Sequence, residues 1–323
     1  MKPRPFQKPA VCLCILVGVA SASLWPAGAT VTTNVFFTRF EAAEGYLTTT
    51  NLVGQNGWLG FGSGGNGLVS DYSFTNQGQQ AYIGYFAPDP GDDRLSVWRP
   101  INFSPVSTNI SLVQFSVLMS IVDSSTTNYD DFYWSVYNAQ GDRLFTLDFD
   151  NYDLGIYYAL DGTNDFVWTG RVFTNDIAYP LVISMNFAQN SWGVTLDGVL
   201  LATNQPITTT SAPLNLGDVD AVWAVFDPAN PGDNYLLFDN YRITAEVLQP
   251  PAPRVQILGR TGDGQFLLRV LGESGARFAI EATTNLTQWT ALKTNAITDG
   301  FFDYVDSSAP AFARRFYRAR WSP

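Results

Sequence analysis

The residues able to support catalysis in this sequence are mainly carboxylates, because the chain contains no histidine. Histidine would be the usual general base and the commonest zinc ligand. Hydrolysis of a glycosidic bond on one strand face needs two carboxylates at alternate positions, since alternate side chains point the same way. None of the glutamates is followed by an aspartate two positions later. The glutamates are Glu41, Glu44, Glu246, Glu273 and Glu281.

Two aspartates, Asp148 and Asp150, do stand two positions apart in a predicted strand. Phe145, Leu147 and Phe149 alternate with them and would form the buried face of that strand. The favoured interpretation is that both aspartates face solvent. We therefore predict that the protein is not an enzyme. A divergent glycan-active hydrolase or lyase that uses carboxylates stays as the least favoured alternative.

Two loops are rich in the oxygen ligands that calcium prefers. Neither has the spacing of an EF-hand, and the same residue types also build ordinary turns, which is the alternative for each loop. These loops predict calcium as a cofactor, and the sequence points to no other. Their candidate ligands are Asp89, Asp92, Asp93, Asp227, Asn230, Asp233 and Asn234.

Aromatic residues in predicted loops and at strand ends suit carbohydrate binding. A sugar presents an apolar face edged by hydroxyls, so it stacks on an aromatic ring and bonds to nearby amides and carboxylates. The alternative for each ring is core packing, which is our prediction for Trp134, Trp192 and Trp223. The candidate carbohydrate-binding residues are Trp58, Phe61, Tyr72, Tyr129, Tyr152, Trp168 and Tyr235.

The N-terminus has the pattern of a secretory signal peptide. Basic residues precede an apolar run at 10–22, and small residues end at Ala27-Gly28-Ala29. This predicts cleavage after residue 29 and a secreted, cell-surface or periplasmic protein. The alternative is an uncleaved anchor, but the run is too short to span a membrane. We expect no stable membrane span after cleavage.

Both cysteines, Cys12 and Cys14, fall inside the predicted signal peptide. The mature chain therefore contains no disulfide scaffold and no thiolate chemistry. Residues 30–247 hold 23 acidic residues and 6 arginines, a net charge of −17, whereas residues 250–323 carry +3. Such an acidic unit repels phosphates, so nucleic acid is excluded as its partner.

The chain reads as an all-β protein. Short alternating segments separated by turn residues recur throughout 35–244, as in an antiparallel sandwich. The clearest part is 181–202, which predicts three consecutive strands with Asp197-Gly198 as a tight hairpin turn. Residues 54–67 are glycine-rich and predict a loop.

Three motifs carry a resemblance to concanavalin A-like, laminin-G-like jelly rolls of exported bacterial proteins. They are Ser-Trp-Gly-Val-Thr-Leu-Asp-Gly-Val-Leu-Leu-Ala-Thr at 191–203, Phe-Asp-Asn-Tyr-Arg-Ile at 238–243, and the opening stretch from Phe40-Glu41 to Gly57-Trp58. The resemblance spans roughly residues 35–247. It implies an antiparallel jelly-roll β-sandwich, a fold that hosts lectins, glycosidases, lyases and structural modules alike.

A proline-rich linker is predicted at 249–253, between a jelly-roll domain at 30–248 and a small β-sandwich module at 254–323. The run Ile-Glu-Ala-Thr-Thr-Asn-Leu-Thr-Gln-Trp at 280–289 and Arg-Phe-Tyr-Arg at 315–318 resemble a C-terminal immunoglobulin-like or fibronectin-like module of exported bacterial proteins. Together these features predict a non-catalytic, carbohydrate-binding module whose partner is an extracellular glycan or cell-surface component, with calcium assisting. A structural or adhesive protein without a sugar site is the alternative.

Overall fold

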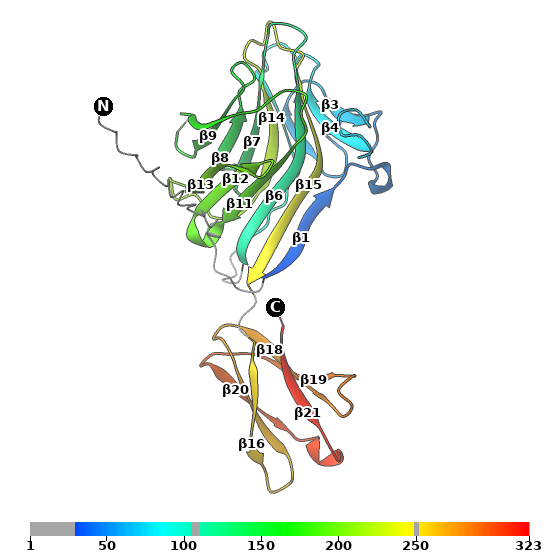
Figure 1. Cartoon of the computed structure of the whole chain (residues 1–323), viewed down its shortest axis with the longest axis vertical. Coiled ribbons are helices and arrows are strands. Elements are labelled where there is room, and N and C mark those ends of the chain that lie inside the picture. Colours follow the sequence, from blue (N-terminus) through cyan, green and yellow to red (C-terminus); the bar gives the residue numbers. More distant parts are fainter. Residues whose placement is uncertain (1–29, 105–109, 164, 249–251, 323) are drawn as a thin grey trace, which may run out of the picture.

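The computed structural model describes residues 30–104, 110–163, 165–248 and 252–322, and these residues form an all-β protein. Figure 1 shows two separate groups of antiparallel strands, one before and one after the predicted linker. The all-β fold class expected from the sequence is confirmed. The predicted signal peptide and residues 249–251 of the predicted linker lie outside the described residues. No helix within the described ranges is long and apolar enough to cross a membrane.

The first large sheet, sheet A, contains eight strands in the order β13-β12-β11-β6-β15-β4-β3, with β1 also paired to β15. Its strands are β1 (Thr30–Thr38), β3 (Asn66–Ser70), β4 (Gln79–Gly84), β6 (Ile110–Val122), β11 (Tyr179–Asn186), β12 (Ser191–Leu196), β13 (Val199–Gln205) and β15 (Tyr235–Leu248).

The second large sheet, sheet B, contains seven strands in the order β10-β9-β8-β7-β14-β5-β2. Its strands are β2 (Leu59–Gly62), β5 (Arg94–Trp98), β7 (Asp131–Tyr137), β8 (Arg143–Phe149), β9 (Gly155–Leu160), β10 (Val167–Val172) and β14 (Asp218–Ala224). Two short 3₁₀ helices, η1 (Ala42–Glu44) and η2 (Phe187–Gln189), lie in the connections.

The meander predicted at 181–202 is formed by β11, β12 and β13. Asp197 and Gly198 both have positive φ values, 49° and 73°, as the predicted tight turn requires. Leu181, Ile183 and Met185 are buried while Val182 and Ser184 between them are half-buried, so the period of two is also confirmed.

The prediction of a plain loop at 54–67 was wrong in part, because β2 and β3 lie there. Each forms one edge of a large sheet, where a strand needs only one partner. Glycine allows that pairing to be close: a Cβ at Gly62 would lie 2.0 Å from the carbonyl oxygen of Arg94, and one at Gly65 2.1 Å from that of Gly84.

An aromatic cluster joins the two large sheets. The ring of Trp134 on β7 lies 5.2 Å from that of Phe115, 5.5 Å from that of Phe238 and 6.5 Å from that of Tyr241, all on sheet A. The hydroxyl of Tyr241 donates a hydrogen bond of 2.9 Å to the carbonyl oxygen of Val219 on β14. The sheets are therefore held together by packing and by a buried polar contact.

The three tryptophans predicted for the core, Trp134, Trp192 and Trp223, are fully buried, which confirms that prediction. Trp192 stacks on Phe145 across the sandwich, with ring centroids 4.0 Å apart and planes 4° from parallel. Like Trp134, Trp192 comes from one large sheet and contacts the other, so sheet-to-sheet packing rests on aromatic rings.

The C-terminal strands form two three-stranded sheets, β16-β17-β20 and β19-β18-β21. Their small core consists of Leu268, Val270, Ala276, Phe278, Ile280, Ile297 and Phe302. The strands are β16 (Arg254–Arg260), β17 (Phe266–Leu271), β18 (Arg277–Thr283), β19 (Thr290–Ala296), β20 (Phe301–Asp306) and β21 (Phe316–Trp321), with the 3₁₀ helix η3 (Ala309–Ala311) before the last strand.

A buried carboxylate, Asp161, ties the turn after β9 to the segment after β13. Its oxygens accept hydrogen bonds from the hydroxyls of Thr208, Thr209 and Thr210 and from the backbone N–H of Thr209 at 2.6 Å. Burial acts to raise the pKa of Asp161, but these bonds outweigh it and hold the pKa well below its usual range.

We expect Asp161→Asn to destabilise the protein by about 2 kcal/mol at pH 7, since an amide cannot accept all of these bonds. The native pKa is depressed, so the stabilisation by Asp161 is present above the unfolded pKa of about 4 and is lost as pH falls below it. Urea unfolding at pH 7 and pH 3 measures both effects. The exposed Asp165→Asn is the matched control, and an Asp161 variant as stable as that control at pH 7 would contradict the prediction.

Candidate functional site

The outer face of sheet B carries most of the polar residues able to contact a ligand. On β7, Phe132, Trp134 and Val136 are buried in the core, so Asp131, Tyr133, Ser135 and Tyr137 project from the opposite face. Strand pairing extends this face sideways into rows of side chains. We call this surface the outer-face groove, because three pockets lie along it.

The rows follow from the register of β7 with its two neighbours. Tyr133 lies opposite Asp148 on β8 and Val222 on β14. In the next row, Ser135 lies opposite Thr146 and Asp220, and Tyr137 lies opposite Arg143 and Asp218. Directly opposite residues are neighbours across about 5 Å, so aromatic, hydroxyl and carboxyl groups from three strands form one surface.

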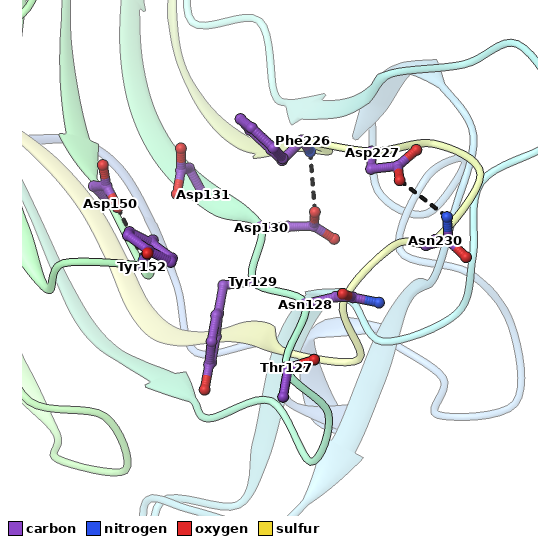
Figure 2. A pocket seen from close by; sticks show the side chains of 10 residues that line it. All are labelled: Thr127, Asn128, Tyr129, Asp130, Asp131, Asp150, Tyr152, Phe226, Asp227 and Asn230. Carbon is purple, nitrogen blue, oxygen red and sulfur yellow. Dashed lines mark hydrogen bonds between the residues drawn. The ribbon is translucent and has the colours of Figure 1, made fainter.

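A pocket of about 530 Å³ lies at one end of the groove, and we call it the rim pocket (Figure 2). Three aromatic residues, four aspartates and two asparagines contribute to its wall. Tyr152 is 83% exposed and Phe226 is 87% exposed, so neither ring is part of the core. The lining residues are Thr127, Asn128, Tyr129, Asp130, Asp131, Asp150, Tyr152, Phe226, Asp227 and Asn230.

Asp130 shapes the rim pocket by fixing the loop at 225–234. Its carboxylate accepts hydrogen bonds from the backbone N–H groups of Phe226 at 3.0 Å and Gly232 at 2.8 Å, and from Nε1 of Trp223 at 3.2 Å. The side chain of Asn234 donates to the backbone oxygen of Asp130 at 2.6 Å. The position of Phe226 over the pocket therefore depends on Asp130.

Asp150 and Asp131 form the opposite wall of the rim pocket. Asp150 accepts a hydrogen bond of 2.9 Å from the backbone N–H of Tyr152, which fixes the turn that presents this ring. Asp131 accepts one of 3.0 Å from the N–H of Asn151, and burial raises the pKa of Asp131 to about 7. This wall therefore offers one carboxyl group that changes charge near neutral pH.

Two further pockets of about 320 and 310 Å³ follow along the groove and share Arg94, Ser96 and Tyr137. Phe166 lies over the first, with its ring 5.8 Å from that of Tyr133. The second is lined by Phe61, Trp98, Asp218 and Asp220, among others.

Asp148 does not face solvent, and that prediction was wrong. It is only 5% exposed, because the larger side chains of Tyr133 and Tyr157 lie directly opposite it on the two neighbouring strands. Burial, reinforced by the charges of Asp131 and Asp150, raises the pKa of Asp148 to about 9. Its Oδ1 atom has no hydrogen-bond partner. The side chain is therefore neutral at pH 7, and one acceptor is unused.

Asp218 and Asp220 occupy alternate positions of β14, so both face the groove. Their carboxyl groups share a hydrogen bond. Burial raises the pKa of both, and the charge of Asp218 raises that of Asp220 further. Two carboxyl groups this close hold one proton between them near neutral pH.

Comparisons with known proteins add the following. A search of protein-family models gives no match, and neither does a search of curated proteins. Among solved structures, the chain is similar to a Bacillus subtilis protein of unknown function with a galectin-like fold, at 8% identity and a TM-score of 0.45 over 68% of this chain and all of that one. It is also similar to basic winged bean lectin with Tn-antigen, at 11% identity and a TM-score of 0.43 over 68% and 99% of the two chains.

A sialidase is similar at 10% identity and a TM-score of 0.45, but the match covers 65% of this chain and only 18% of the sialidase. The antiparallel sheets A and B of the structure themselves match the β-sandwich that the resemblance to concanavalin A-like domains implied. Similarity at this level assigns neither a ligand nor an activity.

The structure separates the seven aromatic residues predicted to bind carbohydrate. Tyr129 and Tyr152 line the rim pocket, Phe61 lines a pocket farther along the groove, and Trp168, 60% exposed, stands on the edge strand β10 opposite Tyr157. These residues come from four separate stretches of sequence, which only the sheet brings to one face.

Three of the seven lie elsewhere. Trp58 is fully buried and its Nε1 donates a hydrogen bond of 2.9 Å to the hydroxyl of Tyr46, so its prediction as a sugar platform was wrong. It packs in the core because the segment before β2 turns inward. Tyr72 and Tyr235 contact each other at a centroid distance of 6.2 Å, and Tyr85 joins them. This cluster lies where β4 ends and β15 begins on sheet A, and its residues line none of the three groove pockets.

The carboxylates predicted to bind calcium, except that of Asp89, accept hydrogen bonds or form ion pairs within the protein. Asp92 accepts a hydrogen bond from Ser63, Asp93 pairs with Arg94, and Asp227 accepts from Asn230. Asp233 accepts from Ser124 and Ser125, while Asn234 bonds to the backbone of Asp130. Asp89 bonds through its backbone N–H to Ser63. In the part of the chain that the structure describes, no group of three or more acidic side chains is placed to hold a metal. Calcium binding stays a prediction.

Several groove residues were missed from the sequence as ligand-binding candidates, namely Trp98, Tyr133, Asp218, Asp220 and Phe226. Alternation within β7 and β14 was a usable signal, because polar residues recur at every second position of 131–137 and at 218 and 220. What the sequence lacked was the pairing of β14 with β7, which are about 80 residues apart.

We expect Asp148→Asn to stabilise the protein by on the order of 2–4 kcal/mol at pH 8 and by much less at pH 5. The native pKa of Asp148 is raised to about 9, so the protonated form contributes stability that is lost as pH rises from about 4 to about 9. An asparagine has no proton to lose. Thermal and urea unfolding across this pH range measure the difference.

Asp197→Asn, in the exposed β12–β13 turn, is the control for removing one negative charge. A stability difference that does not change between pH 5 and pH 8 would show that Asp148 is ionised in the native protein.

Proposed function

We propose that the rim pocket binds a glycan and that the protein is a non-catalytic carbohydrate-binding module. The observation that carries this proposal is the arrangement of Tyr129, Tyr152 and Phe226 around Asp131, Asp150 and Asp227 in one pocket. Stacking of a sugar ring needs an accessible aromatic surface, and Tyr152 and Phe226 are both more than four-fifths exposed.

The polar groups of the pocket supply what sugar hydroxyls need. The carboxylates accept O–H donors, and the amides of Asn128 and Asn230 both donate and accept. The backbone N–H groups of Phe226 and Tyr152 donate hydrogen bonds to Asp130 and Asp150, so the segments that carry these rings need little ordering on binding. Pre-organised aromatic and polar groups in a pocket of this size fit one or two sugar units.

The remaining parts of this proposal concern location and calcium. The N-terminal pattern supports export, and an extracellular or cell-surface glycan is then the partner available to such a module.

The acidic loops support calcium as an additional ligand. Calcium binding is tested by a thermal unfolding scan of residues 30–323, first with EDTA and then with millimolar calcium. A ligand that binds only the folded state raises the midpoint temperature of unfolding. An unfolding midpoint that stays the same with EDTA and with calcium would contradict calcium binding.

For glycan binding, we expect Tyr152→Ala and Phe226→Ala each to weaken affinity about tenfold, which is about 1.4 kcal/mol. A glycan array identifies ligands of residues 30–323, and isothermal titration calorimetry then compares the variants. Both side chains are exposed, so the unfolding temperature should stay within about 2 °C of the wild type.

Tyr72→Ala is the matched control, because this exposed tyrosine lies in the sheet A cluster outside the groove. It should leave glycan affinity unchanged. Either the absence of any glycan ligand or an equal loss in the Tyr72 variant would overturn the rim pocket as the site.

A structural or adhesive function remains a second candidate, favoured by that same exposed cluster. Tyr72, Tyr85, Phe86 and Tyr235 form a connected aromatic surface, with ring centroids 4.8–6.2 Å apart. Such a patch suits contact with another protein. If the Tyr72 variant loses cell-surface attachment while the Tyr152 variant retains it, the adhesive function is the correct one.

A further inference from the structure

The pocket of about 310 Å³ in the outer-face groove differs in chemistry from the rim pocket. Its carboxyl groups belong to Asp218 and Asp220, and its aromatic residues are Phe61, Trp98 and Tyr137. Tyr137 lies directly opposite Asp218 across the β7–β14 pair. We call it the dyad pocket, after the two aspartates.

One oxygen of Asp220 is unsatisfied in the dyad pocket, although its carboxyl group shares a hydrogen bond with that of Asp218. The side chain of Asp220 is only 6% exposed, and its Oδ1 atom has no hydrogen-bond partner. Among the described residues, neither Asp218 nor Asp220 forms an ion pair. A buried carboxyl acceptor without a donor is costly, so a sequence that keeps one in a pocket gains from a ligand that donates to it.

The nearby cations already have partners. Arg94 lines the same pocket, but its Nε pairs with Asp93 at 3.0 Å. Arg143, on the neighbouring strand, donates hydrogen bonds of 3.1 and 2.6 Å to the carbonyl oxygens of Leu160 and Thr163. In the described part of the chain, no arginine or lysine therefore forms an ion pair with Asp218 or Asp220.

We propose that the dyad pocket binds a ligand that carries a primary ammonium group. The ammonium donates to the free oxygen of Asp220 and to Asp218, and the rings of Phe61, Trp98 and Tyr137 surround it. Aromatic rings attract cations through the negative charge of their faces, and carboxylates supply the hydrogen-bond acceptors.

The unpaired acceptor decides which ammonium fits. A primary ammonium has three N–H donors, whereas a quaternary ammonium has none and would leave Oδ1 of Asp220 unsatisfied. Amino sugars and polyamines both carry primary ammonium groups. The inference does not depend on glycan binding at the rim pocket, because the two pockets share no lining residue.

Binding should release a proton. Burial and mutual repulsion raise the pKa of Asp220, so the free pair holds a proton that an ammonium ligand displaces. The other titratable groups close to the pair are Tyr137, Tyr241, Arg94 and Arg143. Since the tyrosines are neutral and the arginines charged at pH 6, the carboxyl pair is the source of the proton.

The test is calorimetry of residues 30–323 at pH 6 with spermidine, a glucosamine tetramer, its N-acetylated form and choline. We expect spermidine and the glucosamine tetramer to bind at least tenfold more tightly than the other two. Titration in buffers of different ionisation heat should show proton release. Asp220→Asn and Asp218→Asn should each weaken ammonium binding at least tenfold and reduce the proton release.

Asp197→Asn is the matched control, since it removes the same charge from an exposed turn outside the groove. An equal loss with this variant would show general attraction to an acidic protein and overturn the site. Equal affinity for the glucosamine and N-acetylglucosamine tetramers would contradict recognition of an ammonium group in the dyad pocket. It would not contradict glycan binding at the rim pocket. If only spermidine binds, the pocket is a polyamine site. If only the glucosamine tetramer binds, it is an amino-sugar site.

Discussion

The pairing register of β7 with β8 and β14 is the constraint on which the groove depends. Because side chains alternate, the burial of Phe132, Trp134 and Val136 fixes which residues of β7 face outward. The same register then places Asp148 beside Tyr133, and Asp220 beside Ser135. A slip of one residue would turn the acidic and aromatic rows into the core and expose Trp134. The aromatic packing of Trp134 against sheet A therefore positions the outward-facing residues of the groove.

The chain treats its buried carboxylates in two opposite ways. Asp161 and Asp130 receive several protein hydrogen bonds each and connect distant segments. Asp148, Asp220 and Asp239 each keep one oxygen without a partner, although all three are more than nine-tenths buried. Unsatisfied buried groups lower stability. Asp239 belongs to sheet A, whereas Asp148 and Asp220 both lie on the outer face of sheet B, where a ligand in the groove can approach them.

The sequence was sufficient for the local parts of this structure. The alternation in 181–202 and the Asp197-Gly198 turn predicted three strands and their connection, because a hairpin is decided by a few adjacent residues. The glycine-rich stretch was harder, since β2 and β3 are edge strands whose pairing depends on a close approach at Gly62 and Gly65. Trp58 was assigned to the surface for a related reason. Nothing within its own neighbourhood indicates that the chain turns inward there.

The site required information that no single segment contains. The rim pocket takes Tyr129 from the end of one connection, Tyr152 from a second and Phe226 from a third, and the hydrogen bonds of Asp130 bring the third to the first. From the sequence, the aspartates of 227–234 looked like a calcium loop, because oxygen-rich turns and metal sites share their composition. In the fold, Asp233 accepts hydrogen bonds from the hydroxyls of Ser124 and Ser125, and Asn234 accepts one from the backbone N–H of Asp130. The loop is thereby held as one wall of the pocket, and this wall carries the exposed ring of Phe226.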